Sequence, residues 1–270
     1  MIDTIPFDEY SLEVIVVDNA SKDDEAFAIS TRYPQVKVIR SEKNLGFSGG
    51  NNLGIKAARG DYLFFINNDT LLRSSNIQSL IDRLKSSEKI GVVCPKIRFT
   101  WDESPIQYAG YTPLSAVTLR NHPIGFGEKD NGQYDTAHPT PYAHGAAMMV
   151  KREVIEKAGM MPEDYFLYYE ELDWSMMIHR AGYDIWYEPA YTIYHKESRT
   201  TGQHSPLRSY YITRNRLLFA KRNINAPEKY LSYIYLVLVA GSKDIIKYAV
   251  QGKMNLAKAV VKGIYHFFKL

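Results

Sequence analysis

The chain has 270 residues, 45% of them hydrophobic and 23% charged, which is ordinary for a globular protein and enough to bury a full core. A single cysteine, Cys94, excludes a disulfide framework and fits a reducing compartment. The first ten residues carry acids and lack a basic, apolar start, so we do not expect them to act as a secretory signal. The net charge is only +3, yet residues 206–270 carry twelve Lys or Arg against two acids, while the rest carries 21 against 28.

Short β-branched runs alternate with helical patterns in the first third of the chain. We expect a buried strand over Leu12–Asp18, then a helix capped by Ser21 that runs to about Tyr33. Further strands are expected at 36–39, 62–66 and 90–94, with helices at 48–58 and 75–86. This alternation predicts an α/β fold with a mostly parallel sheet and helices on both faces.

The stretch 98–141 breaks the rhythm, and we expect hairpins and loops there around a binding cleft. Strands near 142–150, 185–187 and 191–195 and helices over 151–158 and 168–181 should follow. Pro206 opens a helical tail whose longest apolar run, Tyr230–Gly241, is shorter than the roughly 20 residues that cross a bilayer.

The sequence therefore predicts two parts, a catalytic domain over 1–205 and a basic amphipathic helical tail over 206–270. Because basic and aromatic residues alternate in the tail, we expect it to lie on an anionic membrane surface rather than cross the membrane. The alternative is that the tail packs on the catalytic domain and its lysines are merely solvated.

Polar residues stand just after several predicted strands, where doubly wound sheets bind their ligands. They are Asp18 with Asn19, Asn44 with Gly46, Asn67-Asn68-Asp69, and His195. Taken singly, such residues are also common turn formers, Asp69 could cap a helix, and a lone histidine is often a structural hydrogen-bonding group. Carboxylate oxygens suit Mg²⁺ or Mn²⁺, ions that readily bridge a diphosphate.

Two further segments carry candidate chemistry. Asn44–Gly54 is glycine-rich and leads into a helix, whose first N–H groups can bind phosphate, but it lacks both the nicotinamide-binding and the Walker A spacing. Glu170, Glu171 and Asp173 cluster at a helix start beside the aromatic run Tyr165–Tyr169. Acids there complement the helix dipole, and a partly desolvated cluster can also supply a general base.

In this order the segments resemble a known family. Residues 16–21, 44–54, 65–70, 168–174, 180–183 and His195 are similar to the signature of family 2 glycosyltransferases with the GT-A fold. The rhamnosyltransferase-like branch, which works on O-antigens, capsules and cell-wall glycans, is the most similar. The resemblance covers roughly Leu12–Arg222 and implies a nucleotide-diphospho-sugar transferase fold with a helical C-terminal tail.

The resemblance implies an inverting transfer of a sugar from a nucleoside-diphosphate donor to a glycan or polyprenyl-linked glycan. The similarity to the rhamnosyltransferase-like branch suggests that the sugar is rhamnose. Asp69 matches the last aspartate of the D-x-D metal motif, from which Asn67 departs, and His195 matches the histidine that completes an Mg²⁺ or Mn²⁺ site. Asp18 would contact the nucleotide base. The remaining donor-site residues would be Asn19, Asn44, Gly46, Gly50, Asn51 and Asn68.

Glu171 occupies the position of the family's catalytic base, which is usually an aspartate. The longer glutamate side chain leaves Glu170 and Asp173 open as alternatives. A metal held by Asp69 and His195 would neutralise the departing nucleoside diphosphate. The implied location is the cytoplasm, on the inner face of the plasma membrane.

One departure from the family lies ahead of the Asp18 strand. The family normally opens with a strand and a helix there, whereas about ten residues precede Leu12, so we expect an exposed sheet edge. An inactive fragment or pseudoenzyme that binds donor or partner without turnover therefore stays open. A nucleic-acid-binding protein is a third class, and no recognisable module supports it.

Overall fold

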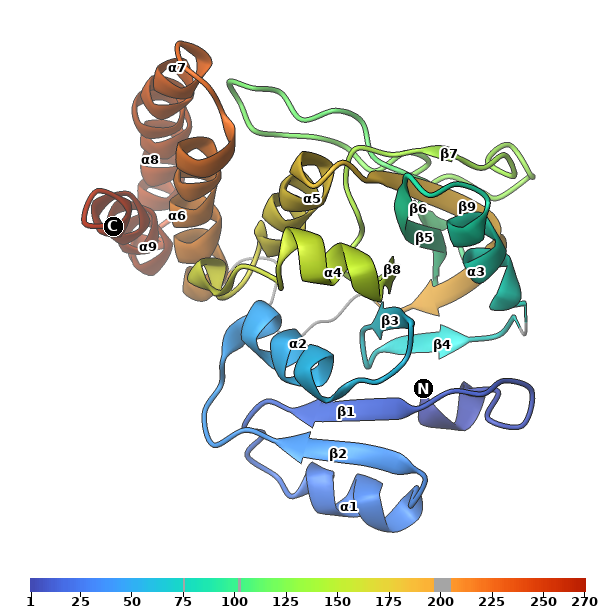
Figure 1. Ribbon diagram of the computed structural model, residues 1–270. Helices are drawn as coiled ribbons and strands as arrows, with labels where there is room; N and C mark the ends of the chain where they lie inside the picture. The colour runs from blue at the N-terminus through green and yellow to red at the C-terminus, as the bar shows by residue number, and fades with distance from the viewer. Residues whose placement is uncertain (75, 102, 197–204) are drawn as a thin grey trace. The chain divides into compact units, whose positions relative to one another are not determined.

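The computed structural model describes residues 1–74, 76–101, 103–196 and 205–270 (Figure 1). The described chain divides into two compact units. The second unit combines the helices from Pro206 onward with two short earlier segments, Pro113–Asn121 and Leu167–Tyr169. The first unit holds the other described residues through Lys196, so each unit is assembled from more than one stretch of sequence.

The strands lie in the first unit. In chain order they are β1 (Val14–Asp18), β2 (Val36–Arg40), β3 (Tyr62–Ile66), β4 (Thr70–Leu72), β5 (Ile90–Phe99), β6 (Ile106–Tyr108), β7 (His138–Pro139), β8 (Ala147–Lys151) and β9 (Asp184–His195). β1 and β2 form a parallel pair of their own. The larger sheet has the order β3-β8-β5-β9-β4, with β6 beside β5 and β7 beside β9.

The larger sheet is mixed, which corrects the prediction of a mostly parallel one. Within the described residues, β5 and β9 pair in parallel, whereas β3–β8, β5–β8 and β4–β9 pair antiparallel. A helical crossover returns the chain to a parallel neighbour, but the stretch between β6 and β8 contains turns and the short β7 instead of a helix. β8 therefore enters the sheet in the opposite direction.

Several element boundaries also differ from expectation. The first helix, α1 (Glu25–Arg32), starts after Asp24, and the Ser21 N–H donates to Asp18 instead of Ser21 capping a helix. β8 begins at Ala147, since the residues before it form a turn, and β9 is one continuous strand where two were expected. Ser75, the expected start of the third helix, lies outside the described residues.

Helices pack against the strands of the first unit. α2 (Gly46–Ala57) packs on β1, α3 (Gln78–Lys85) on β5 and β9, α4 (Arg152–Ala158) on β8, and α5 (Glu170–Arg180) on β9. Buried Leu80 and Leu84 from α3 and Trp174 from α5 contribute to one core. The ring of Trp174 meets that of Phe65 on β3 edge-on, with centroids 5.6 Å apart, and this contact anchors the start of α5.

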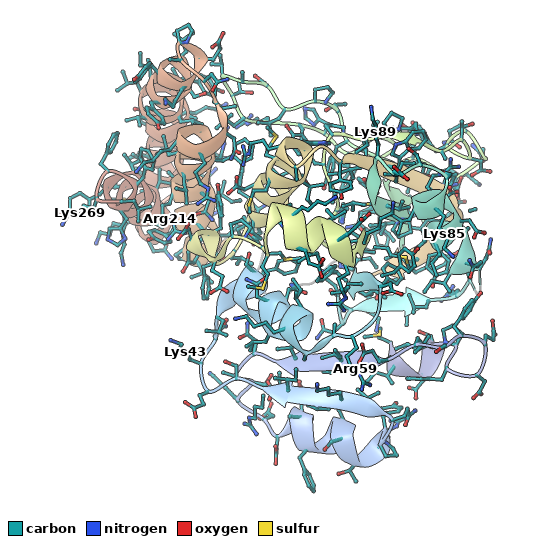
Figure 2. All side chains as sticks on the ribbon, in the orientation of Figure 1. Lys43, Arg59, Lys85, Lys89, Arg214 and Lys269 are labelled. Atoms are coloured by element: carbon teal, nitrogen blue, oxygen red, sulfur yellow. The ribbon has the colours of Figure 1, made fainter. Side chains whose placement is uncertain are left out.

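The second unit is helical. Its elements are α6 (Pro206–Asn223), α7 (Glu228–Ile234), the π-helical segment η3 (Tyr235–Gly241), α8 (Ser242–Val250) and α9 (Met254–Phe267). Ser205 caps α6 by accepting the Arg208 N–H, and the Asn215 side chain donates to the carbonyls of Leu167 and Tyr168. Within the described residues, every helix is too short or too polar to cross a bilayer. Lys269 follows α9 near the C-terminus (Figure 2).

Candidate active site

The two predicted metal ligands meet at one edge of the larger sheet. Asp69 lies in the turn between β3 and β4, and His195 ends β9, where it pairs with Thr70. Asp69 Oδ1 is 3.0 Å from His195 Nε2, and both side chains are largely buried. Because Thr70 begins a strand, Asp69 does not cap a helix, and the turn instead holds its carboxylate against the imidazole.

Gln107 on β6 determines the tautomer of His195. Its Oε1 lies 2.9 Å from His195 Nδ1, and an amide oxygen can only accept, so Nδ1 carries the proton. In the neutral imidazole, Nε2 then turns a lone pair towards the Asp69 carboxylate. Among the described residues, neither Nε2 nor either Asp69 oxygen has a hydrogen-bond partner of good geometry. The contact is therefore unfavourable unless a proton or a cation lies between the two groups.

The surroundings of Asp69 favour its charged form. Burial alone would raise the pKa of Asp69, but the adjacent His195 side chain, a backbone hydrogen bond and Lys196 together hold the pKa below the ordinary 3.8. Asp69 is therefore ionised at neutral pH. A buried carboxylate without a hydrogen-bond donor is costly, and a bound cation would remove that cost.

The pair fits a divalent cation that takes only part of its ligands from the protein. Across the described parts of the chain, no three His, Cys, Asp or Glu side chains come together as a ligand set. Mg²⁺ and Mn²⁺ often take one or two protein ligands and fill the rest of their coordination with water and substrate phosphates. The Asp69 oxygens and the Nε2 lone pair offer donors of the right chemistry.

Glu171, in the first turn of α5, faces the turn that precedes β8. Its Cγ is 3.9 Å from where a Cβ on Gly145 would lie, and the Phe47 ring reaches within 3.7 Å of the same point. Burial raises the pKa of Glu171 above the ordinary 4.5. This environment brings the carboxyl pKa closer to neutrality, as a general base requires.

The other two acids of the cluster face the interior of the first unit. Glu170 is 3% exposed and Asp173 is 0% exposed, and Trp174 on the same face of α5 is fully buried. Glu170, Asp173 and Trp174 lie on one face of α5, and that face is packed in the interior. Of the three acids, Glu171 therefore has the best access for a substrate.

The predicted donor loop is organised by Asn19. Its Nδ2 donates to the Gly46 carbonyl at 2.9 Å, and its Oδ1 accepts the Leu45 N–H at 2.9 Å. Asn44 Oδ1 accepts the Gly46 N–H at 2.9 Å, and a Cβ on Gly50 would lie 3.2 Å from the Asn19 amide. Asn19 and Asn44 therefore shape the loop with their side chains, and Gly50 leaves room for Asn19.

The remaining donor-site candidates lie near this loop or on the turn beside Asp69. The Asp18 Oδ1 accepts the Ser21 N–H, and its Oδ2 is 3.4 Å from the Arg40 guanidinium. The Ser21 hydrogen bonds, followed by Arg40, lower the pKa of Asp18 below 3.8. Asn51 donates to the Phe47 carbonyl within α2, and Asn68 is exposed on the turn beside Asp69.

His144 is a site residue that the sequence did not single out. Its Nδ1 accepts the Ala146 N–H at 3.1 Å, and its ring lies parallel to that of Tyr111, with centroids 5.8 Å apart. Burial, followed by the nearby His195, lowers the pKa of His144 to about 3. It is therefore neutral at physiological pH, with its proton on Nε2. The sequence signal, a lone His-Gly before an apolar strand, is too weak to identify such a residue.

The structure thus brings the candidate residues into three groups. Asp69, His195 and Gln107 are in direct contact, and Asn19, Asn44, Gly46 and Gly50 form the donor loop. Glu171 belongs to a third group around Gly145, and the electrostatic influence of its carboxylate reaches Tyr111, which stacks on His144. His195 also contributes to the lowered pKa of His144, so His144 lies near the Asp69–His195 pair as well.

Comparisons with known proteins show the family to which the chain belongs. The model of glycosyl transferase family 2 matches residues 4–159, so the chain belongs to that family and is a glycosyltransferase. This result confirms the family that the sequence motifs suggested.

Two curated relatives match over most of their length. The chain is 24% identical over 259 residues to the low-salt glycan biosynthesis hexosyltransferase Agl10 of Haloferax volcanii, covering 94% of this chain and 82% of the relative. It is 25% identical over 216 residues to the N-acetylglucosaminyl-diphospho-decaprenol L-rhamnosyltransferase of Mycobacterium tuberculosis, covering 72% and 70%. These names place the chain in the rhamnosyltransferase-like branch.

Solved structures confirm the GT-A fold. GalNAc-T7 with UDP, GalNAc and Mn²⁺ matches with a TM-score of 0.60 at 15% identity, covering 92% of this chain and 53% of that chain. The mannosyltransferase PcManGT from Pyrobaculum calidifontis, in complex with GDP-Man and Mn²⁺, matches with a TM-score of 0.56 at 15% identity, covering 99% and 81%.

Proposed function

We propose that this glycosyltransferase moves a sugar from a nucleoside-diphosphate donor to a hydroxyl group of a glycan or polyprenyl-linked glycan, with inversion at the anomeric carbon, in surface polysaccharide synthesis. Two relatives support this class, one named as a glycan biosynthesis hexosyltransferase and one as an N-acetylglucosaminyl-diphospho-decaprenol L-rhamnosyltransferase. A second rhamnosyltransferase, RfbF of Shigella flexneri, makes rhamnose the first donor sugar to test.

One observation carries the proposal: a largely buried carboxylate and an imidazole nitrogen face each other 3.0 Å apart, an arrangement that a bound cation would stabilise. Asp69 and His195 would hold Mg²⁺ or Mn²⁺, and Gln107 keeps Nε2 free to do so. When bound, such an ion supplies Lewis-acid stabilisation of the diphosphate leaving group. The Mn²⁺ in the two solved relatives supports the same choice of ion.

Glu171 is the general base in this proposal. Its raised pKa and its position facing Gly145 suit a carboxylate that removes the proton of the acceptor hydroxyl. The neutral His144 would donate its Nε2–H to an oxygen of the substrate. Asp18 would contact the nucleotide base, and the loop held by Asn19 would line the donor site together with Asn44, Gly46, Gly50, Asn51 and Asn68.

The second unit would hold the enzyme on an anionic membrane surface, on the cytoplasmic face of the plasma membrane. Large apolar side chains are exposed on its last three helical segments, among them Leu238, Ile246, Val250, Val261 and Phe268. The exposed Lys258 and Lys262 lie on α9, which carries no acid. Apolar side chains next to lysines are the pattern of a helix that lies in the headgroup region.

A panel of nucleotide sugars, including dTDP-rhamnose, GDP-mannose and UDP-hexoses, tests the activity. We expect one donor to be hydrolysed slowly in the presence of Mn²⁺ or Mg²⁺, and hydrolysis to stop with chelator. Calorimetry on the same panel separates an enzyme from a pseudoenzyme, because the latter would bind a donor without consuming it. If no donor binds with either metal, the proposed function is wrong.

A further inference from the structure

An exposed cluster of aromatic rings lies at the end of β5. The rings of Phe99 and Trp101 are stacked with centroids 3.8 Å apart and planes 28° apart, and Phe126 meets Phe99 edge-on at 5.5 Å. Phe99 is 2% exposed, whereas Trp101 is 42% and Phe126 55% exposed. We call these three residues the aromatic platform: a buried ring that supports two rings open to solvent.

The platform adjoins the metal-ligand pair. Phe99 and His195 are in-register neighbours on the parallel strands β5 and β9, and side chains of such neighbours project from the same face of a sheet. The last residue of β9 is the metal ligand, and the last residue of β5 supports the platform. The buried ring that supports the platform is therefore a direct strand neighbour of the proposed metal ligand.

Backbone hydrogen bonds hold the platform in place. The Phe99 N–H donates to the Pro105 carbonyl at 2.9 Å, and the Ser104 N–H donates to the Trp101 carbonyl at 2.9 Å, which closes the turn that carries Trp101. The Gly127 N–H donates to the Ile106 carbonyl at 2.8 Å and so fixes the segment of Phe126 against β6. A preorganised surface of this kind loses little conformational entropy when a ligand stacks on it.

The chemistry of the platform favours a sugar ring. Aromatic faces carry partial negative charge, and the polarised C–H groups on one face of a pyranose pack against them. The rim is polar, because Lys129 pairs with Glu103 at 2.9 Å and both side chains are exposed, so hydroxyl groups would find donors and acceptors. A lipid chain would not match such a rim, and the proposed contact for the nucleotide base, Asp18, lies in the separate β1–β2 sheet.

We propose that Trp101 and Phe126 form a binding site for a pyranose ring of the acceptor glycan. The site takes one sugar by stacking it on the two exposed rings, and the polar rim selects its hydroxyl pattern. This assignment of the acceptor rests on the proposed function, but stacking itself requires neither donor nor metal. The platform can therefore be tested without turnover.

Saturation-transfer NMR with methyl glycosides of rhamnose, glucose, galactose and N-acetylglucosamine is the direct test. We expect at least one glycoside to receive saturation at the C–H protons of one ring face in the wild type. Trp101→Ala should remove this signal, Trp101→Phe should keep most of it, and Phe27→Ala should leave it unchanged. Phe27 is a matched control because it is exposed on α1, far along the chain from the platform.

Fluorescence adds a second readout, since Trp101 is the most exposed of the three tryptophans. A bound glycoside should protect it from acrylamide quenching. Once an acceptor is known, Trp101→Ala should raise the acceptor KM about tenfold, the scale of losing one stacked ring, and leave the donor KM unchanged. Circular dichroism and the melting temperature of Trp101→Ala control for folding.

Three results would overturn the proposal. The first is that no glycoside shows saturation transfer that depends on Trp101. The second is that anionic vesicles protect Trp101 from quenching while the glycosides do not. The third is that Trp101→Ala changes the oligomeric state and leaves glycoside binding unchanged. Failure of the proposed function gives a different pattern. Glycoside binding that depends on Trp101, together with no turnover of any nucleotide sugar, would keep the platform and reject the transferase reaction.

Discussion

Two polar regions of the first unit differ in whether their polar side chains have hydrogen-bond partners within the protein. Around Asn19, the amide and carbonyl groups of the loop pair with one another, so both polar atoms of the Asn19 side chain and the side-chain oxygen of Asn44 already have partners. At Asp69 and His195, a carboxylate and an imidazole nitrogen are buried without a hydrogen-bond partner among the described residues. The first region is satisfied by the chain itself, and the second is complete only with something added.

The difference separates residues that shape a site from residues that bind a ligand. A satisfied side chain contributes stability, and its loss weakens the fold locally. An unsatisfied buried group costs stability and persists at functional sites because it binds something. Substitutions in the two regions should therefore move stability in opposite directions.

The largest effect is expected at Asp69. Asp69→Ala should abolish Mn²⁺- or Mg²⁺-dependent donor binding, because it removes the only carboxylate of the pair, and it should leave the melting temperature of the metal-free protein equal or higher. Calorimetry and thermal unfolding measure both, with Asp61→Ala, an exposed acid before β3, as the control. Donor affinity that is the same with and without chelator would contradict the metal assignment.

The next effect concerns Glu171. Glu171→Gln should keep donor affinity and reduce turnover about 10²-fold or more, the scale of losing a general base. Because the folded-state pKa is raised above 4.5, the carboxylate form is disfavoured in the folded chain at neutral pH. The uncharged glutamine should therefore also raise the melting temperature near pH 7.

The pH profile of kcat/KM checks the same assignment. The rate should fall as the pH drops through the raised pKa of Glu171, so the acid limb should lie above 4.5, while this group's contribution to stability improves over the same range. Glu170→Gln and Asp173→Asn are the comparison variants. If one of them abolishes turnover while Glu171→Gln does not, the base is wrongly assigned.

A smaller, structural effect is expected at Asn19. Asn19→Ala would leave the Leu45 N–H and the Gly46 carbonyl without their partners, which should lower the free energy of unfolding by about 1–3 kcal/mol. Donor affinity should fall only moderately, because the loop loosens but keeps its backbone. Asn51→Ala loses one side-chain hydrogen bond within α2 and should lower the free energy of unfolding less than Asn19→Ala does, as measured by chemical denaturation. If Asn19→Ala and Asn51→Ala are equally stable, the hydrogen bonds of Asn19 do not stabilise the loop as inferred.

The smallest effect is expected in the second unit, where Lys258 and Lys262 are exposed on α9. Lys258→Glu with Lys262→Glu should weaken co-sedimentation with anionic vesicles, on the order of 1 kcal/mol for each charge removed near the surface, and added salt should weaken wild-type binding. Lys22→Glu with Lys56→Glu is a control of equal net charge in the first unit. Equal recovery of the wild type with neutral and anionic vesicles would reject a charged membrane contact.

The sequence predicted the position of the longer strands and of the polar residues that follow them, because alternation of apolar runs and turn formers is local information. The short strands β4, β6 and β7 were not predicted individually. The pairing direction of the strands was predicted less well. β8 runs antiparallel because of the irregular stretch before it, and no local pattern specifies where such a stretch returns. The family resemblance, not periodicity, identified the GT-A fold.

The candidate site shows the same limit. Asp69 and His195 stood out because each follows or ends a strand, and the family resemblance assigned them to a metal; Gln107 was not predicted, since its contact with His195 joins residues 88 positions apart. Asn19 was expected to face the ligand, whereas its amide is directed to the chain's own backbone. A sequence motif indicates which residues belong to a site. Only the tertiary contacts show which of their side chains are already hydrogen-bonded to the protein.

The donor loop and the segment that leads to α5 are joined at one point. The Phe47 N–H donates to the Phe166 carbonyl at 2.8 Å, and Gly46, with a φ of 74°, approaches so closely that a Cβ there would lie 2.2 Å from the same carbonyl oxygen. In terms of amide hydrogen exchange, the Phe47 proton can exchange only when these two segments separate. The exchange rate of this one amide therefore measures how often the loop parts from the segment that leads to α5.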